Sequence, residues 1–370
     1  MKIGLNATCF NDRPSGAKQR FIGIYTELFR LLKDDEFVVY EPSDCRMATW
    51  FDYPGNVTFK QTPIASSGRF QKLLAGLRYW PSELSSEQFD IFECFHLPLL
   101  KTYAGKTLLT IHDIRGLYAK GNWWERVVYK AALEMSLKHA DHVITVSEAV
   151  RDEVQGFYPM TPISVIYNGI DVEFFKKNTQ SELQEVRQRL GIPEHFLLAV
   201  GHFEKRKNYQ NLVEAIGRLH ALGHPVHLVI IGNDSGEVRG IEGRVEALNL
   251  SSHVHIFNGL TDDDVRCVYN LSELFVFPSS YEGFGIPILE AMASGRPVVL
   301  SDTPVFREIT QNQGEYFPPH DPDAIADTIA SILSSPEKQK RLVQYGTSRV
   351  LDFGFGSIAR DLATLYRSFV

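Results

Sequence analysis

Cysteine is scarce in this sequence, and long apolar runs are missing. No two of the four cysteines form a C-x-x-C pair, so the spacing argues against a disulfide framework or a zinc site and favours a reducing compartment. No apolar run approaches the length of a membrane span, and residues 1–6 already have the pattern of a strand rather than of a cleaved signal. We expect a cytoplasmic protein, soluble or peripheral at the inner membrane face. The cysteines are Cys9, Cys45, Cys94 and Cys267.

An excess of positive charge is also missing. The net charge is −7, and because residues 1–168 hold equal numbers of basic and acidic side chains, the whole negative excess lies in residues 169–370. A broad nucleic-acid surface needs clustered lysine and arginine, so we expect no nucleic-acid partner. Only the balanced first half is suited to approach an anionic membrane.

The glycine fingerprint of a dinucleotide enzyme is the third absence. The first strand continues into NATCF at residues 6–10 instead of G-x-G-x-x-G, and no such fingerprint opens a later helix. The segment GNDSG at residues 232–236 has the composition of a turn between elements. These features argue against a nicotinamide dehydrogenase, the obvious competitor for a chain with this pattern.

Strand-like and helix-like segments alternate along the whole chain, which predicts βαβ units and parallel sheets. A chain of 370 residues is long enough for two domains. The polar run at residues 176–181 and a helix ending at Gly191 place the boundary near residue 171, giving domains 1–170 and 171–354. Each half should form a doubly wound sheet. The expected strands are 3–5, 37–40, 57–60, 91–95, 107–111, 143–146, 165–167, 197–200, 227–231, 254–257, 274–277 and 298–300.

The most informative segment is EGFGIPILE, residues 282–290. It follows the apolar run 274–278 and leads into a helix, so it should lie at the carboxyl end of a buried strand, where open α/β sheets bind ligands. The amides of residues 283–286 would face an anion at the helix start. Glu290, about one turn further, would accept hydrogen bonds from a sugar diol, while Glu282 would reach the group beyond the phosphates. The pattern predicts a nucleotide-sugar site; a solvated helix glutamate is the alternative for Glu290.

This segment resembles the E-x7-E motif of the retaining, GT-B-fold glycosyltransferases of family 4. The resemblance implies an α/β fold of the GT-B type, with two doubly wound Rossmann-like domains facing across a cleft and a last helix, 355–370, that crosses back onto the first domain. It also implies transfer of a sugar from a nucleoside diphosphate sugar with retention, and without a catalytic metal or other cofactor. Four further ordered segments carry it: TIHD at 110–113, VSE at 146–148, YNGID at 167–171 and VGHFEKRKN at 200–208.

Two cations are expected to hold the diphosphate. Arg206 and Lys207 follow a strand, and Asn208 has the side chain of an N-cap for the helix after it, so both charges should lie beside a helix start. A solvated basic loop is the alternative. Many family members carry an arginine directly after the glycine of this motif, where this chain has His202, and Arg206 is the residue expected to supply the missing contact.

In the first domain, His112 ends the strand 107–111. A lone histidine is more often structural, but the resemblance implies that His112 lines the pocket near the donor sugar and phosphate. Asp113 is expected to orient the ring and to keep it partly protonated. Gly16 opens the next helix and should let the backbone approach the phosphates across the cleft.

The acid cluster 262–264 follows Thr261, so it is interpreted as the capped first turn of a helix rather than as a metal site. No metal ligand is therefore predicted. The predicted catalytic residues are His112, Arg206, Lys207 and Glu282, and the predicted substrate-binding residues are Gly16, Leu260, Gly283, Phe284, Gly285, Ile286 and Glu290.

One segment indicates where the acceptor binds. Residues 69–80 (RFQKLLAGLRYW) combine apolar positions at helical spacing with basic residues and no acid. Such a helix can lie in a membrane interface, or it can pack its apolar side on the sheet with its basic side in water. Trp123 and Trp124 begin a second aromatic and basic patch. We expect a glycan or lipid-linked acceptor and peripheral membrane contact through 69–80.

The details of the motifs are most similar to bacterial mannosyltransferases of O-polysaccharide assembly. This resemblance implies transfer of mannose from GDP-mannose in cell-surface polysaccharide synthesis. No carboxylate pair is placed for double displacement, so front-face substitution is favoured, with the departing phosphate oxygen taking the acceptor proton. A UDP-sugar donor stays open, as does an epimerase or hydrolase of the same fold. A non-catalytic binding subunit is disfavoured because Glu282, Glu290, Arg206 and Lys207 are all intact.

Overall fold

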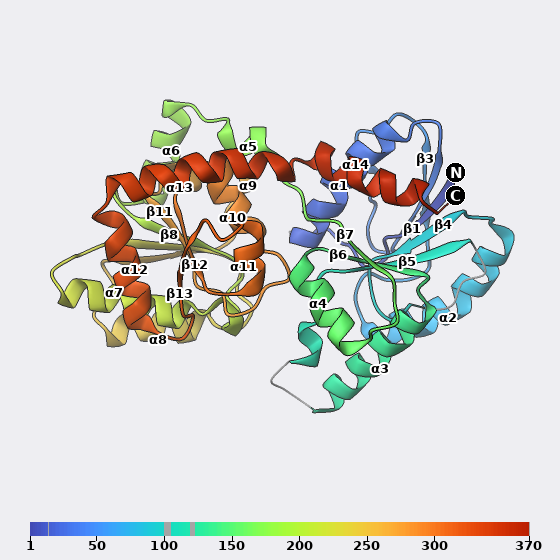
Figure 1. Ribbon diagram of the computed structural model, residues 1–370, viewed down its shortest axis with the longest axis horizontal. Helices are drawn as coiled ribbons and strands as arrows, with labels where there is room; N and C mark the ends of the chain where they lie inside the picture. The colour runs from blue at the N-terminus through green and yellow to red at the C-terminus, as the bar shows by residue number, and fades with distance from the viewer. Residues whose placement is uncertain (14, 100–104, 119–122, 370) are drawn as a thin grey trace. The chain divides into compact units, whose positions relative to one another are not determined.

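The computed structural model describes residues 1–13, 15–99, 105–118 and 123–369; the side chains of 69–71 and 73 are also outside the description. The chain divides into two compact units, unit 1 (residues 1–169 and 355–370) and unit 2 (residues 170–354). The boundary lies one residue before the expected one. Each unit is a parallel sheet with helices packed on it (Figure 1).

In the described part of unit 1, seven parallel strands follow the order β3-β2-β1-β4-β5-β6-β7. The central strands are buried along nearly their whole length, because parallel sheets are covered on both faces. Every strand expected here is present, although β7 lies two residues before its expected position. The bounds are β1 (Lys2–Asn6), β2 (Glu36–Glu41), β3 (Val57–Gln61), β4 (Ile91–Cys94), β5 (Lys106–Ile111), β6 (His142–Thr145) and β7 (Ile163–Val165).

Helices complete unit 1, and the last of them comes from the end of the chain. Ile358 and Leu362 of α14 are buried in the core of this unit. The ring of Phe355 lies so close to α1 that a Cβ added at Gly23 would be 2.2 Å from it. Tyr366 donates a hydrogen bond to the buried carboxylate of Glu93. The helices are α1 (Gly16–Leu31), α2 (Arg69–Ser86), α3 (Trp123–His139), α4 (Glu148–Phe157) and α14 (Phe355–Arg367), with short 3-10 turns η1 (Ala48–Trp50) and η2 (Arg115–Leu117).

Unit 2 repeats this construction with the described strands in the order β10-β9-β8-β11-β12-β13. All five strands expected here are confirmed. The sixth, β13, was not predicted because it has only three residues and no apolar run. The bounds are β8 (Leu197–Val200), β9 (Leu228–Ile231), β10 (Val254–Phe257), β11 (Leu274–Phe277), β12 (Val298–Ser301) and β13 (Glu315–Phe317).

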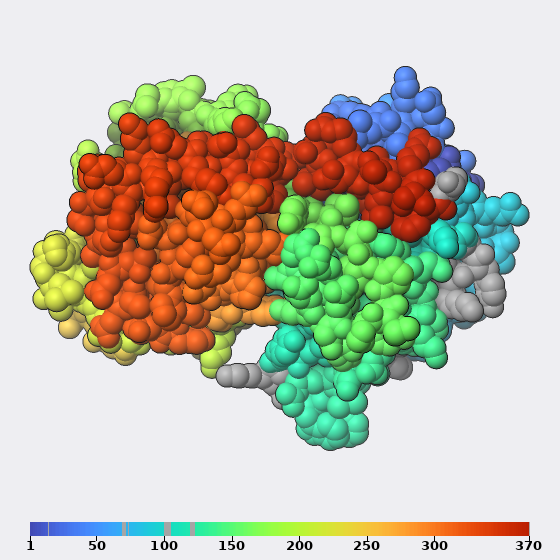
Figure 2. All heavy atoms as spheres, viewed as in Figure 1, coloured from blue at the N-terminus to red at the C-terminus, as the bar shows by residue number. Residues whose placement is uncertain are grey.

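Helices pack on the sheet of unit 2, and in Figure 2 orange and red residues, from α10 to α13, form much of the surface of this unit that faces the viewer. None of the described helices of either unit combines the length and the apolar character needed to cross a membrane. The bounds are α5 (Val172–Lys176), α6 (Gln180–Leu190), α7 (Tyr209–Ala221), α8 (Val238–Ala247), α9 (Asp262–Leu271), α10 (Ile286–Ala293), α11 (Pro304–Ile309), α12 (Pro322–Leu333) and α13 (Pro336–Arg349), with 3-10 turns η3 (Lys205–Lys207) and η4 (Val350–Phe353).

Candidate active site

Arg206, Lys207 and Glu282 come together beyond the carboxyl ends of β8 and β11. The Lys207 Nζ lies 2.6 Å from Oε1 of Glu282, and Nη1 of Arg206 lies 2.6 Å from Oε2 of the same carboxylate. The backbone reinforces this arrangement, because the Ser280 amide donates to the Arg206 carbonyl at 2.8 Å. Gly201 makes room for it: its φ is +149°, and a Cβ there would lie 3.0 Å from Lys207 Nζ.

The charges in this group are strongly coupled. Burial alone would raise the pKa of Glu282, but Lys207 and Arg206 outweigh it and lower the pKa to about 2, so the group is a carboxylate at neutral pH. The Ser279 hydroxyl also donates to it at 2.7 Å. Burial lowers the pKa of Lys207, and Glu282 opposes that shift. We call Arg206, Lys207 and Glu282 the charge cluster.

The charge cluster contains ion pairs that the sequence interpretation did not include. Arg206 and Lys207 were expected to bind a diphosphate, and Glu282 was expected to contact the sugar. In the structure both cations are paired with the Glu282 carboxylate. Arg206 also holds Glu204 through Nε at 2.6 Å. A diphosphate would therefore add to, or compete with, ion pairs that already exist, and the diphosphate clamp stays a prediction.

Asn208 does not act as the expected side-chain cap. It occupies the N-cap position of α7 with a left-handed backbone (φ 60°), but its side chain forms no capping bond. Instead its amide nitrogen donates to the carbonyls of Pro278, at 3.1 Å, and Pro319. These bonds fasten η3 to the end of β11. The neighbouring His202 has a buried Nδ1 without a hydrogen-bond partner among the described residues.

The loop before α10 has the expected position at the end of β11. Gly285 adopts φ 109°, and a Cβ there would lie 3.0 Å from the Phe306 ring, so the loop needs a glycine. Phe284 is buried and its ring packs on Phe353, so a contact of Phe284 with a ligand would have to come from its backbone. Gly283 and Ile286 are half-buried.

Glu290 is not the solvated helix residue that was the alternative. It is buried within α10, and the Tyr269 hydroxyl donates to its Oε2 at 2.7 Å. Burial raises the pKa of Glu290 to about 7, although the hydrogen bond from Tyr269 opposes the shift. The side chain therefore titrates near neutral pH. No feature of the sequence indicated Tyr269 as its partner.

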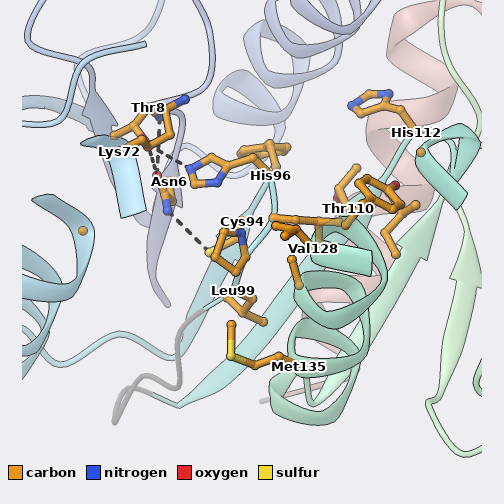
Figure 3. Close-up of a pocket in the computed structure, with 18 of the residues that line it drawn as sticks. Asn6, Thr8, Lys72, Cys94, His96, Leu99, Thr110, His112, Val128 and Met135 are labelled. Carbon is orange, nitrogen blue, oxygen red and sulfur yellow. Dashed lines mark hydrogen bonds between the residues drawn. The ribbon is translucent and has the colours of Figure 1, made fainter. Parts of the chain in front are cut away.

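In unit 1, the expectation for the charge of His112 is wrong. Burial, with a smaller contribution from Arg20, lowers the pKa of His112 to about 3, so the ring is neutral (Figure 3). Asp113 accepts from the Arg115 amide at 3.1 Å and lies 3.6 Å from its guanidinium. Asp113 is thus engaged with Arg115. Gly16 is the exposed first residue of α1.

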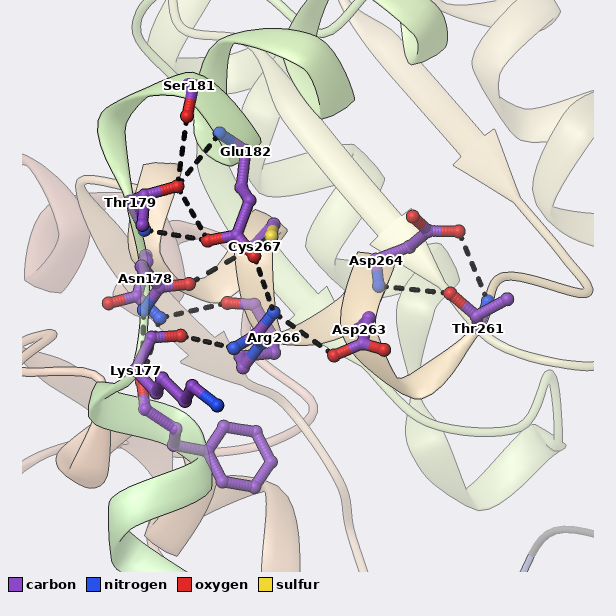
Figure 4. A network of polar contacts seen from close by, with 12 residues as sticks. Lys177, Asn178, Thr179, Ser181, Glu182, Thr261, Asp263, Asp264, Arg266 and Cys267 are labelled. Carbon is purple, nitrogen blue, oxygen red and sulfur yellow. Dashed lines mark hydrogen bonds and ion pairs between the residues drawn. The ribbon is translucent and has the colours of Figure 1, made fainter.

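The acid cluster 262–264 forms a capped helix start, as expected. Thr261 and Asp264 make a reciprocal capping box at the start of α9, and Asp263 lies 3.1 Å from the buried Arg266 (Figure 4). Arg266 also donates to the Lys177 carbonyl, which fastens the start of the polar run 176–181 onto α9. Leu260, directly before the cap, is half-buried.

Apart from Leu260, the structure brings together the predicted residues of unit 2, but it does not test their roles. The charge cluster, the 283–286 loop and Glu290 all lie beyond or just after the carboxyl ends of β8 and β11. His112 and Gly16 belong to unit 1, so their part in the same site stays a prediction, as does the cleft that the resemblance implies.

Two family profiles match this chain. "Glycosyltransferase Family 4" matches residues 31–174, and "Glycosyl transferases group 1" matches residues 183–349. The first match lies in unit 1 except for residues 170–174, the second lies in unit 2, and together they leave only short segments uncovered. The chain therefore belongs to the group 1 glycosyltransferases of family 4.

Two of the relatives found by sequence comparison are named as mannosyltransferases. The chain is 30% identical over 251 residues to the O-antigen chain mannosyltransferase RfbU of Salmonella typhimurium, a match that covers 67% of this chain and 66% of RfbU. It is 28% identical over 266 residues to the serotype-specific mannosyltransferase WbdA of Escherichia coli, covering 69% of this chain and 32% of WbdA. The chain thus spans less than two thirds of the length of these relatives.

Solved structures show the same fold over the full length. Sucrose-phosphate synthase from Thermosynechococcus elongatus superposes with a TM-score of 0.79 at 20% identity, covering 100% of this chain and 98% of that one. WaaG, a glycosyltransferase involved in lipopolysaccharide biosynthesis, superposes with a TM-score of 0.76 at 19% sequence identity, and the match covers 99% of both chains. Anabaena HepE in complex with UDP and glucose superposes with a TM-score of 0.76 at 17% sequence identity, and the match covers 99% of both chains. The fold is the expected GT-B fold.

Proposed function

We propose that this protein transfers mannose from GDP-mannose to a glycan or lipid-linked acceptor during cell-surface polysaccharide synthesis, with retention at the anomeric carbon. The charge cluster carries the proposal, because it places two cations directly before the start of α10. Its position matches a diphosphate leaving group at a helix N-terminus. The mannosyltransferase names of RfbU and WbdA support the sugar.

In this mechanism the protein stabilises the negative charge that develops on the departing diphosphate. The departing diphosphate gains negative charge as the sugar bond breaks, and Arg206, Lys207 and the first amides of α10 would stabilise it. Glu282 stays ionised, so it cannot donate a proton; it orients both cations. The phosphate oxygen takes the acceptor proton on the same face of the sugar. Neutral His112 would offer hydrogen bonds to a sugar hydroxyl but no charge.

The acceptor side of the proposal rests on unit 1. In α2, Trp80 packs against Tyr40 and Phe92, whereas Leu74 and Leu77 are 52% and 50% exposed. Part of the 69–80 segment thus packs on the sheet, and part leaves apolar side chains in solvent; Phe70 and Leu73 lie outside the described side chains. We propose peripheral contact with the inner membrane face through these leucines, in the cytoplasm.

The donor is tested by thermal unfolding with GDP and UDP. GDP at a hundredfold excess over its Kd should raise the free energy of unfolding by about 2.7 kcal/mol, whereas UDP at the same concentration should do much less. A parallel assay follows mannose transfer from radiolabelled GDP-mannose. Stabilisation by UDP alone would favour the UDP-sugar alternative. Stabilisation by GDP with release of free mannose only, whatever glycan is added, would favour a hydrolase.

Activity should persist after exhaustive chelation. Magnesium and manganese need several oxygen ligands, usually carboxylates beside the phosphates. Asp263 and Asp264 are engaged in a capping box and ion pairs, and the proposed phosphate position is already lined by two cations. We therefore expect the turnover rate with EDTA to equal the untreated rate. A loss that magnesium or manganese restores would overturn the metal-free mechanism.

A further inference from the structure

Asn208 directly follows Lys207 and connects the turn that carries both cations to two other segments. Its backbone is left-handed, with φ 60° and ψ 29°, a conformation that asparagine and glycine adopt more readily than other residues. Its amide nitrogen donates to the carbonyl of Pro278 at 3.1 Å and to the carbonyl of Pro319. Pro278 follows β11 and Pro319 follows β13, so one side chain joins η3 to the carboxyl ends of two strands.

The oxygen of the Asn208 amide group is engaged as well. It accepts from the side-chain nitrogen of Asn211, in the first turn of α7, at 2.8 Å. A primary amide offers two donor hydrogens and an acceptor oxygen, so three partners hold this side chain in one orientation. Aspartate has the same shape but lacks the donors, and glycine lacks the whole group.

The segment that begins at Pro278 reaches the charge cluster within a few residues. Ser280 donates to the Arg206 carbonyl through its amide at 2.8 Å and through its hydroxyl at 3.1 Å. In return, Nη1 of Arg206 donates to the Tyr281 carbonyl at 3.0 Å. Glu282 comes next, so the position of its carboxylate relative to the two cations depends on how closely η3 lies against this segment.

The charge cluster depends on this close fit because its members are largely removed from water. Lys207 is buried, and the side chain of Glu282 is nearly so. In such surroundings an ion pair offsets the loss of hydration only when its contacts are short, and one partner left alone is costly. Misplacing a catalytic group by about 1 Å can lower a rate on the order of a hundredfold.

We propose that Asn208 is a positioning residue for the charge cluster. Its amide group holds Arg206 and Lys207 at the distance from Glu282 at which both cations meet the departing diphosphate. In this role Asn208 acts through the cations and not on the substrate. The effect on turnover rests on the proposed function, whereas the effect on the ion pairs does not. The competing explanation is a residue that only stabilises the fold of unit 2.

Asn208→Gly removes the amide group and keeps the left-handed backbone accessible. We expect kcat for mannose transfer to fall about tenfold or more, while the Kd for GDP changes less than about threefold. A cation that has become mobile can still reach a bound diphosphate, but it no longer meets the developing charge at a fixed position. Asn208→Asp keeps the shape of the side chain without its donors, so it should lose at least as much turnover.

Asn249→Gly is the matched control. Asn249 has a similar left-handed backbone, with φ 55°, in the segment that leads from α8 to β10. The substitution changes backbone freedom in the same way, but near the amino end of a strand and away from the charge cluster. It should change neither kcat nor the Kd for GDP. A loss of kcat equal to that of Asn208→Gly would mean that only backbone freedom matters, and it would overturn the proposal.

Coupling to Glu282 separates positioning from general stabilisation. Glu282→Gln leaves the buried ammonium of Lys207 without its carboxylate, and η3 released by Asn208→Gly lets that ammonium move toward water. The two substitutions should therefore not act independently. We expect the double variant to turn over as fast as Glu282→Gln alone, about tenfold faster than independent effects would give. Independent losses of kcat, or an unchanged kcat in Asn208→Gly, would overturn the positioning role.

The two proposals fail separately. If the native protein transfers mannose from GDP-mannose and Asn208→Gly does so equally well, the positioning role is wrong and the proposed function stands. If the native protein turns over no donor, the proposed function is wrong, and urea unfolding decides the positioning role alone. The decreases in the midpoint urea concentration for Asn208→Gly and Glu282→Gln should then be smaller in combination than their sum. Decreases that add would overturn the positioning role as well.

Discussion

Glu282→Gln is expected to lower kcat about 100-fold or more, while the Kd for GDP changes less than tenfold. Glutamine keeps the shape of the side chain but removes the charge that holds two cations. Lys207 is 6% exposed and would become a buried ammonium without its carboxylate, so its pKa should fall further and Arg206 should lose its alignment. The cations then no longer meet the developing charge in their fixed positions.

Glu204→Gln is the matched control for this variant. Glu204 binds the same arginine, through Nε at 2.6 Å, but its side chain is 26% exposed, whereas that of Glu282 is 10% exposed and contacts both cations. We expect a much smaller loss of kcat, because a half-buried ion pair with one cation contributes less than the more deeply buried carboxylate that contacts two. Equal losses of kcat in the two variants, or equal losses of kcat and GDP affinity in Glu282→Gln, would contradict the role given to Glu282.

The affinity for GDP should fall about tenfold between pH 8 and pH 6, because the pKa of Glu290 is about 7 in the free protein. If the ribose hydroxyls donate to Glu290, the nucleotide selects its ionised form. Protonation as the pH falls through 7 removes that form, so binding weakens at low pH, levels off above pH 8 and releases a proton near pH 7. Calorimetry in buffers of different ionisation enthalpy measures both quantities.

Glu290→Gln isolates this effect from the titration of the nucleotide, whose terminal phosphate also has a pKa near 6. The variant should bind GDP about tenfold to a hundredfold more weakly at pH 8, through the loss of a charged hydrogen bond. It should also lose the part of the pH dependence that the native protein shows with guanosine. Unchanged affinity, or an unchanged pH profile with guanosine, would remove Glu290 from the nucleoside site.

The sequence predicted the elements well and the electrostatics poorly. The apolar runs of the strands and the glycines of the 282–290 loop have local causes, so their positions could be inferred from neighbouring residues. The pairing of Glu282 with Arg206 and Lys207 joins segments far apart in the chain, and no local pattern specifies it. The neutral state of His112 and the raised pKa of Glu290 depend on burial, which only the folded structure shows.

A pocket of about 1100 Å³ in unit 1, lined by Lys72, His96 and His112 among others, was missed for the same reason (Figure 3). Lys72 was interpreted only as part of the basic segment 69–80, and His96 was assigned no role. Their common position depends on how α2 packs beside the ends of β1 and β4. The signal available in the sequence was weaker: polar residues such as Asn6, His96 and His112 follow successive strands, and the carboxyl ends of parallel strands gather at one edge.

The return of α14 to unit 1 has a consequence for biosynthesis. Unit 2 is inserted within unit 1, so the ribosome completes unit 2 before it makes the helix that covers α1. Until then the core residues that pack against Ile358 and Leu362 stay exposed, and Glu93 lacks the hydrogen bond that Tyr366 donates to it. The nascent first unit is thus an incomplete domain awaiting its final segment, and it is the part of the chain on which chaperones would act longest.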